Sequence, residues 1–329
     1  MKKRVLTGIK PTGTPHIGNY LGAIKPSLSL MNDGDVECLF FIADIHALTT
    51  IHNSKQLQNN VYEIACTWLA CGLDPNNVVF YKQSSIAEIF ELCVILTNFT
   101  PKGLMNRAHA YKAQSESNLE KSLDIDHNIN MGLYNYPILM AADILLFDTD
   151  LVPVGQDQKQ HIEIARDIAQ YFNNKFGSKL KLPNELITKG LEVLIGTDGR
   201  KMSKSYNNVI PLFSSSDVLK KSIFSIMTDS SMPNEPKETD SAIFKLYRGF
   251  ATGDEIESFS NAFTRGISWR EAKEELWRVV EREVGPMRER YNYFMENKCE
   301  VDNILLEGAA KAKILAGKKI DKVRRTLGI

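Results

Sequence analysis

Two short segments, far apart in the sequence, carry side chains that suit phosphate binding. Residues 16–19 read His-Ile-Gly-Asn and follow a turn rich in glycine, proline and threonine, while residues 201–205 read Lys-Met-Ser-Lys-Ser. An apolar strand that enters a helix through such a turn lets backbone approach a ligand, and the helix start offers unpaired N–H groups to an anion. Lys201 and Lys204 add positive charge. The two segments therefore predict a nucleotide site, although neither a G-x-x-x-x-G-K-[ST] loop nor a G-x-G-x-x-G turn occurs.

One carboxylate, Asp143, stands in a stretch that is otherwise apolar. Residues 132–147 predict a buried helix that begins or kinks near Pro137. A buried carboxylate is costly unless it is paired. The partner of Asp143 is then either a group of the protein, such as a backbone N–H or a basic side chain, or a hydrogen-bond donor on a ligand. An indole N–H is a ligand group of this kind, because it donates and cannot accept.

A third polar group stands at the start of another expected helix. Residues 151–154 (Leu-Val-Pro-Val) predict a short strand, and residues 155–158 (Gly-Gln-Asp-Gln) then begin an amphipathic helix. The helix dipole favours an acid in this position whether or not a ligand is present. Helix position alone therefore leaves the role of Asp157 open.

The elements that must position these groups alternate between strands and helices. Apolar runs of strand length occur near residue 5, at residues 38–43 and at residues 78–81, and helical patterns occupy residues 54–72 and 86–99. Continuous apolar runs suit parallel strands that are buried on both faces. This order predicts an α/β fold with a doubly wound parallel sheet, whose ligand sites lie at the carboxyl ends of the strands.

The last third of the chain reads differently. From residue 211 onward the pattern is helical without strand-like runs, and it includes a capping box at Ser268 and Glu271. We expect a sheet-containing domain over residues 1–210, with an inserted polar and helical segment at about 101–145, and a helical domain over residues 211–329. The final helix carries a basic cluster, which suits a phosphate backbone but is also common on a solvated surface.

Composition and charge narrow the class of protein. The 329 residues include 40 Lys or Arg and 40 Asp or Glu, so any nucleic-acid partner must be bound by a local basic patch. The five cysteines show no C-x-x-C spacing, which favours free thiols in a reducing compartment. The N-terminus lacks the apolar run of a signal peptide, and no segment reaches the ~18 apolar residues of a membrane span. We expect a cytoplasmic protein with no membrane partner.

The His-Ile-Gly-Asn and Lys-Met-Ser-Lys-Ser segments together resemble the two signatures of class I aminoacyl-tRNA synthetases, in the form common in the tryptophan and tyrosine branch. Two further segments, PILMAADILL and VPVGQDQKQHIE, resemble those of bacterial tryptophanyl-tRNA synthetases. The resemblance covers nearly the whole chain, with the motifs in the family's order. It implies a Rossmann-like catalytic domain of the HUP type, followed by an all-helical domain that binds the anticodon.

The resemblance also implies an activity. Members of this family activate L-tryptophan with ATP to tryptophanyl-adenylate, release pyrophosphate, and transfer tryptophan to the 3′ end of tRNA(Trp). ATP and Mg²⁺ would be required, and the family's habit is a homodimer. The substrate carboxylate is itself the nucleophile, so no Ser/His/Asp or Cys/His constellation is expected.

The family's residue roles are carried over to matching positions of this sequence. The resemblance implies that catalysis depends on His16, Asn19, Lys201 and Lys204. It implies an ATP site formed by Lys10, Pro11, Thr12, Gly18, Asn19, Gly155, Gln156, Asp157, Val193, Lys201, Met202, Ser203, Lys204 and Ser205. It implies a tryptophan site formed by Asp143, Tyr136, Met140, His46, Leu6 and Gln158. In this reading Asp143 accepts the indole N–H, and no protein residue ligates a metal.

Three departures from the family pattern affect substrate binding. Lys10 stands where glutamine is usual, Leu6 stands where an aromatic residue is usual, and residues 106–112 lack the pattern expected for binding the substrate ammonium group. Other functions stay open. A tyrosyl-tRNA synthetase is one, because aspartate also accepts from a phenol. A synthetase-like RNA-binding protein without catalysis is another, and a nucleotidylyltransferase of related fold would leave the helical C-terminal part unexplained.

Overall fold

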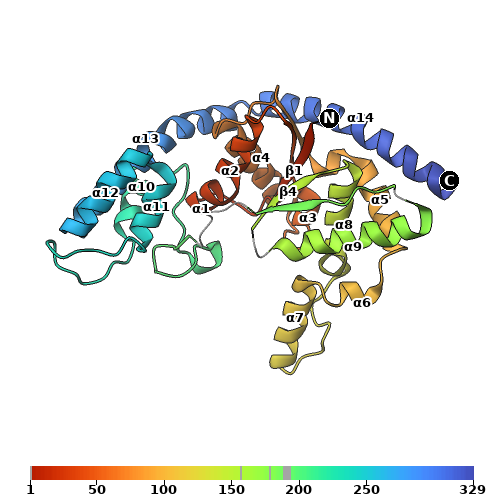
Figure 1. Cartoon of the computed structure of the whole chain (residues 1–329), viewed down its shortest axis with the longest axis horizontal. Coiled ribbons are helices and arrows are strands. Elements are labelled where there is room, and N and C mark those ends of the chain that lie inside the picture. Colours follow the sequence, from red (N-terminus) through yellow and green to blue (C-terminus); the bar gives the residue numbers. More distant parts are fainter. Residues whose placement is uncertain (1, 156–157, 178, 188–193) are drawn as a thin grey trace.

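The computed structural model describes residues 2–155, 158–177, 179–187 and 194–329. Within these residues the chain forms a five-stranded parallel sheet in the order β3-β2-β1-β4-β5 (Figure 1). The strands are β1 Lys3–Ile9, β2 Val36–Ile42, β3 Val78–Lys82, β4 Leu151–Val154 and β5 Asn184–Ile187. The order runs outward from β1 on both sides, so the prediction of a doubly wound sheet is confirmed. The direction of winding reverses between β1 and β4.

Helices connect the strands and cover the sheet. Between β1 and β3 they are α1 Ile17–Asn19, the π-helical turn η1 Tyr20–Ile24, α2 Lys25–Met31, α3 Asp44–Ala47 and α4 Ser54–Ala70. Between β3 and β5 they are the 3₁₀ turn η2 Gln83–Ser85, α5 Ala87–Thr97, α6 Lys102–Met105, α7 His109–Glu120, α8 Met131–Leu146 and α9 Lys159–Phe176. Beyond β5 they are the 3₁₀ turn η4 Lys204–Tyr206, α10 Ser216–Phe224, α11 Ala242–Phe250, α12 Gly253–Arg265, α13 Trp269–Glu296 and α14 Lys298–Leu327.

Both faces of the sheet are buried, as the continuous apolar runs predicted. Along β2, Phe40 and Ile42 belong to one apolar cluster, and Leu39 and Phe41 belong to the other. The first cluster includes residues of η1, α4 and the helices α10 to α13, whereas the second includes residues of α5, α8, α9 and the later part of α14. The sheet is therefore the middle layer of three, and its strand ends are the edges open to a ligand.

The helix after β1 begins next to His16, as predicted, and runs through α1, η1 and α2 without a break. Within it the N–H of Lys25 donates to the carbonyl of Tyr20, which is the wider spacing of a π-helix. Pro26 follows and has no N–H to donate, so the α-helical bonding is interrupted at this point in any case. The positive end of the helix dipole therefore lies at the turn that leaves β1.

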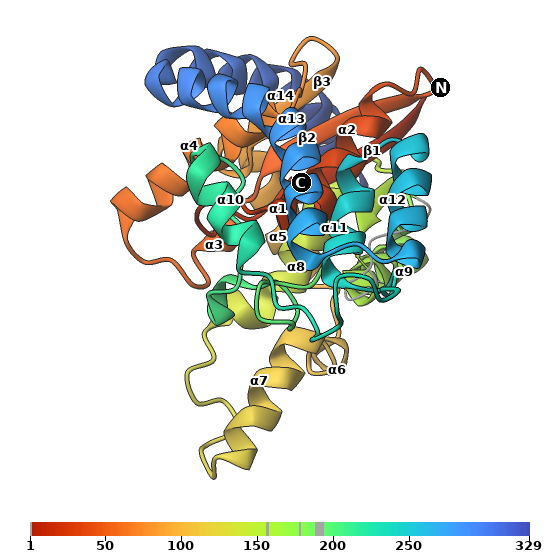
Figure 2. The same ribbon diagram turned by 90° about the vertical axis from the view of Figure 1, so that its left-hand side faces the viewer.

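The inserted segment between α5 and α8 extends away from the body of the molecule (Figures 1 and 2). Its polar residues form two helices, α6 and α7. The buried helix α8 begins at Met131, with the Asn130 side chain accepting a hydrogen bond from the N–H of Leu133 at 2.9 Å. The helix therefore starts well before Pro137 and includes it, because Asn130 provides the N-cap.

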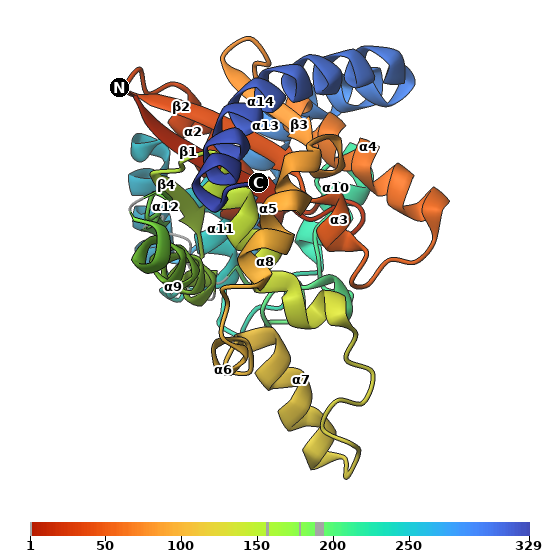
Figure 3. The ribbon, with the colours of Figure 1, turned by 90° about the vertical axis from the view of Figure 1, so that its right-hand side faces the viewer.

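The C-terminal helices form a lobe beside the sheet, but the last helix returns to the sheet (Figures 1 and 3). Helices α10 and α11 pack against α13, whose predicted capping box at Ser268 and Glu271 is present. Helix α14 packs instead along β3 and contacts α5. The domain boundary near residue 210 stays a prediction, and it does not separate α14 from the sheet.

The basic cluster of α14 is partly used inside the protein. Lys319 is buried and pairs with Asp148, just before β4. Arg324 pairs with Glu91 on α5, with 2.6 Å between Nη2 and Oε2. These two cations fasten α14 to the body of the molecule, so they are not free to contact a phosphate backbone.

Helix α14 approaches the sheet closely at Gly308. A Cβ atom at this position would lie 1.7 Å from the carbonyl oxygen of Phe80 on β3. We expect Gly308→Ala to destabilise the protein by about 1–3 kcal/mol or more, because the added methyl group would force the helix away from the strand. Thermal or denaturant unfolding of the purified variant would measure this loss.

Gly317 provides a matched control on the same helix. A Cβ atom there would meet no atom within 4 Å. Gly317→Ala should stabilise the protein by up to about 1 kcal/mol, because alanine forms helix more readily than glycine. Equal effects of the two substitutions would contradict the close helix–strand contact at Gly308.

Candidate active site

A cavity of about 260 Å³ lies at the carboxyl ends of β1, β2 and β4, where the strand order reverses. It is lined by Leu6, Gly8, Lys10, Phe41, Ala43, His46, Tyr136, Met140, Asp143, Ile144, Val152, Pro153, Val154, Gly155 and Gln158. Every residue predicted for a tryptophan site is among them. A mostly apolar cavity with few polar groups fits a small molecule that has a large apolar part.

Asp143 lies on α8 at the wall of this cavity and is almost completely buried. His46 Nε2 lies 3.0 Å from Asp143 Oδ2, and Gln83 Nε2 donates to both carboxylate oxygens at 2.9 Å. Burial raises the pKa of Asp143, and the bonds from His46 and Gln83 oppose that rise. Asp143 therefore does have partners within the protein. A carboxylate offers about four acceptor sites, so it can still accept from a donor in the cavity.

Gln83 was not predicted, although it contacts both oxygens of Asp143. It is completely buried and begins η2, directly after β3. The N–H of His46 donates to Gln83 Oε1 at 3.3 Å, which turns the Gln83 amide nitrogen toward Asp143. The signal available in the sequence was its position, a polar residue at the carboxyl end of an apolar strand.

Aromatic side chains form part of the cavity wall. The ring of Tyr136 lies 4.5 Å from the imidazole of His46, measured between centroids. Phe41 on β2 leans over Gly8 on β1, where a Cβ atom would lie 2.4 Å from the Phe41 ring. Phe41 thus supplies aromatic surface beside Leu6, the position where the family pattern led us to expect an aromatic residue.

The two segments predicted to bind phosphate lie next to each other. The N–H of Ile17 donates to the carbonyl of Ile210 at 2.9 Å, and the N–H of Leu212 donates to the carbonyl of Pro15 at 3.1 Å. These bonds tie the chain that follows residues 201–205 to the start of α1. Lys204 reaches the turn itself, with its Nζ donating to the carbonyl of Thr12 at 3.3 Å.

His16 precedes the first helical residue and is buried close to Lys204. Burial, helped by the positive charge of Lys204, lowers the pKa of His16 to about 4. The imidazole is therefore neutral at pH 7 and can donate one ring N–H. Asn19 Oδ1 accepts from the N–H of His16 at 3.1 Å. Gly18 leaves room for this arrangement, because a Cβ atom there would lie 2.8 Å from His16 Nδ1 and 3.1 Å from Met202 Sδ.

The Lys-Met-Ser-Lys-Ser loop is held in place by Asn208, which was not predicted. Asn208 is buried, and its Oδ1 accepts from the N–H of Ser203 at 2.7 Å. Its Nδ2 donates to the carbonyl of Lys201 at 3.0 Å and to Asp198 Oδ1 at 2.6 Å. Within the loop Met202 is buried, whereas both lysines are exposed. The backbone of the loop is thus fixed while its charged groups remain available.

The other residues predicted for ATP binding fall in different places. Pro11 and Thr12 lie in the turn after β1, whereas Lys10 and Gly155 line the cavity that contains Asp143. The cavity and the turn are therefore neighbouring parts of one region at the end of β1. Three further predicted residues lie outside the described part of the chain: Gln156, Asp157 and Val193.

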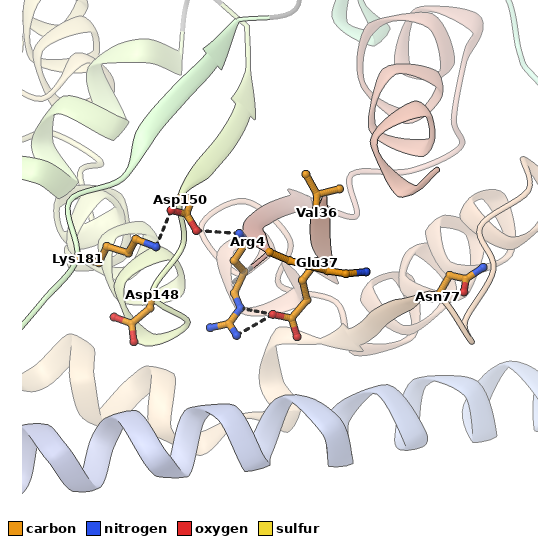
Figure 4. Close-up of a pocket in the computed structure, with 8 residues that line it drawn as sticks. Arg4, Val36, Glu37, Asn77, Asp148, Asp150 and Lys181 are labelled. Carbon is orange, nitrogen blue, oxygen red and sulfur yellow. Dashed lines mark hydrogen bonds and ion pairs between the residues drawn. The ribbon is translucent and has the colours of Figure 1, made fainter. Parts of the chain in front are cut away.

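A larger cavity, of about 770 Å³, lies at the opposite edge of the sheet (Figure 4). Its charged side chains neutralise one another: Arg4 pairs with Glu37 at 2.7 Å, and Asp150 pairs with Lys181 at 2.5 Å. Asp150 also accepts from the N–H of Arg4 at 2.8 Å. Ligands of parallel sheets bind at the carboxyl ends of strands, and this cavity lies at their amino ends. It is not a candidate for the active site.

The described part of the chain offers neither a cluster of metal ligands nor a membrane-spanning helix. Across residues 2–155, 158–177, 179–187 and 194–329, no three His, Cys, Asp or Glu side chains are grouped so that they could hold a metal ion. None of the helices in these ranges combines the length and the apolar character needed to span a bilayer. All five cysteines have free thiols.

A family model described as tRNA synthetases class I (W and Y) matches residues 1–291 of the chain. The chain belongs to this family. The match includes both segments that were predicted to bind phosphate and every residue that lines the cavity around Asp143. The family and fold class predicted from the sequence are therefore confirmed.

Individual members of this class I synthetase family resemble the chain over its full length. The tryptophan–tRNA ligase of Pseudomonas aeruginosa is 48% identical over 333 residues, which cover 100% of this chain and 74% of that protein. The tryptophan–tRNA ligase of Neisseria meningitidis serogroup A is 46% identical over 330 residues, which cover 100% of this chain and 98% of that protein. The crystal structure of tryptophanyl-tRNA synthetase from Campylobacter jejuni, complexed with ADP and tryptophan, superposes with a TM-score of 0.87 at 41% identity and covers 99% of this chain and 100% of that one.

Proposed function

We propose that this chain is a tryptophan–tRNA ligase, which activates L-tryptophan with ATP and transfers it to tRNA(Trp). The observation that carries the proposal is Asp143, a carboxylate held by His46 and Gln83 at the wall of a small, mostly apolar cavity. An indole ring needs apolar walls and one acceptor for its N–H, and the cavity offers both. The relatives named tryptophan–tRNA ligase, and the similar structure complexed with tryptophan and ADP, support this choice of substrate.

We propose that Lys10 holds the carboxylate of the amino acid. It is the sole lysine or arginine among the described residues that line the cavity. Its Nζ donates to Thr49 Oγ1 at 2.7 Å, and burial lowers its pKa. Lys10 lines the same cavity as Asp143 and directly precedes the turn at Pro11 and Thr12, so a carboxylate bound there would face the phosphates of ATP. In the reaction this carboxylate forms a bond to the α-phosphorus, and the bond from that phosphorus to pyrophosphate breaks.

ATP would extend from the start of α1 to the Lys-Met-Ser-Lys-Ser loop. Neutral His16 would donate a hydrogen bond to phosphate, the Asn19 side chain would add a further donor, and the positive end of the helix dipole would favour the phosphate charge. Lys201 and Lys204 would stabilise the negative charge that grows on the leaving pyrophosphate. We assign the ribose to Gly155, Gln156 and Asp157. Catalysis would then consist of positioning and charge stabilisation, without a protein nucleophile.

Further components complete this proposal. Mg²⁺ would enter with ATP, because it prefers phosphate oxygens and water to a cage of protein ligands, and the described residues contain no such cage. The helices beyond residue 210 would contact the anticodon arm of tRNA, and the 3′ end of tRNA would receive tryptophan from the adenylate. We expect a cytoplasmic homodimer.

ATP–pyrophosphate exchange by the purified protein, with each standard amino acid in turn, tests the proposal. We expect exchange in magnesium-containing buffer with L-tryptophan alone. Exchange with tyrosine instead would keep the family and overturn the assignment of Asp143 to an indole. If no amino acid supports exchange, the catalytic proposal fails, and the remaining function is that of an RNA-binding protein without catalytic activity.

A further inference from the structure

A second buried carboxylate, Asp44, lies close to the tryptophan cavity without lining it. It is the first residue of α3 and is separated from the end of β2 by Ala43 alone. Its Oδ1 accepts from the N–H of Ile45 at 3.1 Å and from the N–H of Ser84 at 2.9 Å. Its Oδ2 accepts from the hydroxyl of Ser84. Asp44 therefore joins α3 to η2, two short segments that leave neighbouring strands.

These two segments carry the two protein partners of Asp143. His46 lies on α3 and Gln83 lies on η2, next to Ser84. The N–H of His46 donates to Gln83 Oε1, so the orientation of the Gln83 amide depends on where α3 lies relative to η2. Gln83 and His46 then fix the Asp143 carboxylate. Hydrogen bonds and the adjacent residues Ser84 and Gln83 thus connect Asp44 to Asp143, and of the connecting side chains only His46 is among the residues that line the cavity.

We propose that Asp44 is a positioning residue for tryptophan recognition. It holds η2 against α3, so that Gln83 and His46 keep Asp143 in the orientation that accepts the indole N–H. This inference rests on the proposed function, because it assigns Asp44 a role in the same substrate site. Asp44 itself touches neither the cavity nor the predicted phosphate-binding residues.

The charge of Asp44 cannot account for such a role. The negative charge of Asp44 contributes to raising the pKa of Asp143, which disfavours the ionised acceptor. Removing that charge alone would therefore help Asp143 to accept a hydrogen bond. A loss of tryptophan affinity in Asp44→Asn must come from the lost hydrogen bonds to η2.

The test compares Asp44→Asn and Ser84→Ala with the wild-type protein by steady-state ATP–pyrophosphate exchange. We expect Asp44→Asn to raise the KM for tryptophan about tenfold and to leave the KM for ATP within a factor of about two, because a side-chain amide replaces three carboxylate bonds incompletely. Ser84→Ala removes the hydrogen bond from the Ser84 hydroxyl to Asp44 and keeps the one from the N–H of residue 84. It should raise the KM for tryptophan by a smaller factor, about threefold, in a protein whose fold is less affected.

Asp150→Asn is the matched control. Asp150 also accepts from a backbone N–H and a side chain, those of Arg4 and Lys181, but it lies at the amino end of β4 (Figure 4). The same change of chemistry there should leave the KM for tryptophan unchanged, whatever it does to the unfolding temperature.

Each outcome decides the role of Asp44. Wild-type values for tryptophan in Asp44→Asn and Ser84→Ala, or a parallel rise of both KM values, would overturn the positioning role while leaving the proposed function intact. Absence of tryptophan-dependent exchange in the wild-type protein would overturn the proposed function instead. A rise confined to tryptophan, larger in Asp44→Asn than in Ser84→Ala and absent in Asp150→Asn, would establish the role.

Discussion

Replacement of Lys204 by alanine should lower kcat for tryptophan-dependent ATP–pyrophosphate exchange by about 10²–10³-fold, the usual effect of removing one donor from a site of developing charge. Lys204 Nζ already reaches the turn before α1, where it lies 3.3 Å from the carbonyl of Thr12. Its charge also contributes to the lowered pKa of His16. A phosphate chain bound between these groups would contact the lysine directly. Exchange at saturating ATP and tryptophan measures the effect.

The loss should appear in the chemical step and not in tryptophan binding, because Lys204 does not line the cavity. The Kd of Lys204→Ala for tryptophan in the absence of ATP, measured by equilibrium dialysis, should equal that of the wild-type protein. Lys221→Ala is the control, since Lys221 is an exposed lysine on α10 outside both predicted sites. A comparable loss of kcat in both variants would mean that the reaction depends on the overall positive charge of the protein and not on a lysine positioned at the phosphates.

The layered sheet could be predicted because its signal repeats along the chain. Residues 38–43 are apolar without interruption, and β2 buries Leu39 and Phe40 on opposite faces of the sheet. Such a run needs a covering layer on each side, whatever the rest of the chain does. His46 follows this apolar run in the sequence, and the structure places it in the cavity near the carboxyl end of β2, where parallel sheets bind their ligands.

Residues that join separate elements could not be found in this way. Gln83 and Asn208 are buried amides in short segments, and neither belongs to a periodic pattern. Gln83 bonds to a residue on α8, and Asn208 bonds back to the loop before it. The hydrogen bonds that make these two residues important form only after the chain has folded. A buried polar residue next to a strand end or a charged loop is the only trace that such contacts leave in a sequence.

The last helix carries two sequence patterns, and the more conspicuous one, its basic residues, does not explain where the helix packs. The basic residues of α14 suggested a surface for nucleic acid, yet the helix also has small residues on its inner side, at Gly308, Ala309, Ala312 and Ala316. Small residues spaced by about one turn let a helix approach another element closely. That spacing, and not the charge, corresponds to the contact with β3.

Asp143→Asn should lower kcat/KM for tryptophan by about 10²-fold, because a hydrogen bond to a charged group contributes about 1.5–3 kcal/mol. Both oxygens of the ionised carboxylate only accept hydrogen bonds. They can therefore accept from His46, from Gln83 and from a further donor in the cavity. Asparagine would turn its NH₂ group toward one of them. Either the network with Gln83 or the bond to the indole must then be lost. Exchange kinetics with varied tryptophan at saturating ATP measure the change.

An analogue that lacks the indole N–H separates recognition from a general loss of structure. In β-(benzothiophen-3-yl)alanine, sulfur replaces the N–H group, so the ligand offers no donor to Asp143. The wild-type protein should prefer tryptophan over this analogue by about 10²-fold, and Asp143→Asn should lose most of that preference, since each single change already removes the same bond. If Asp143 only supports the local fold, the substitution would reduce activity toward both compounds equally and the preference would persist. The ratio of the two kcat/KM values is therefore the decisive quantity, because loss of active protein cancels from it.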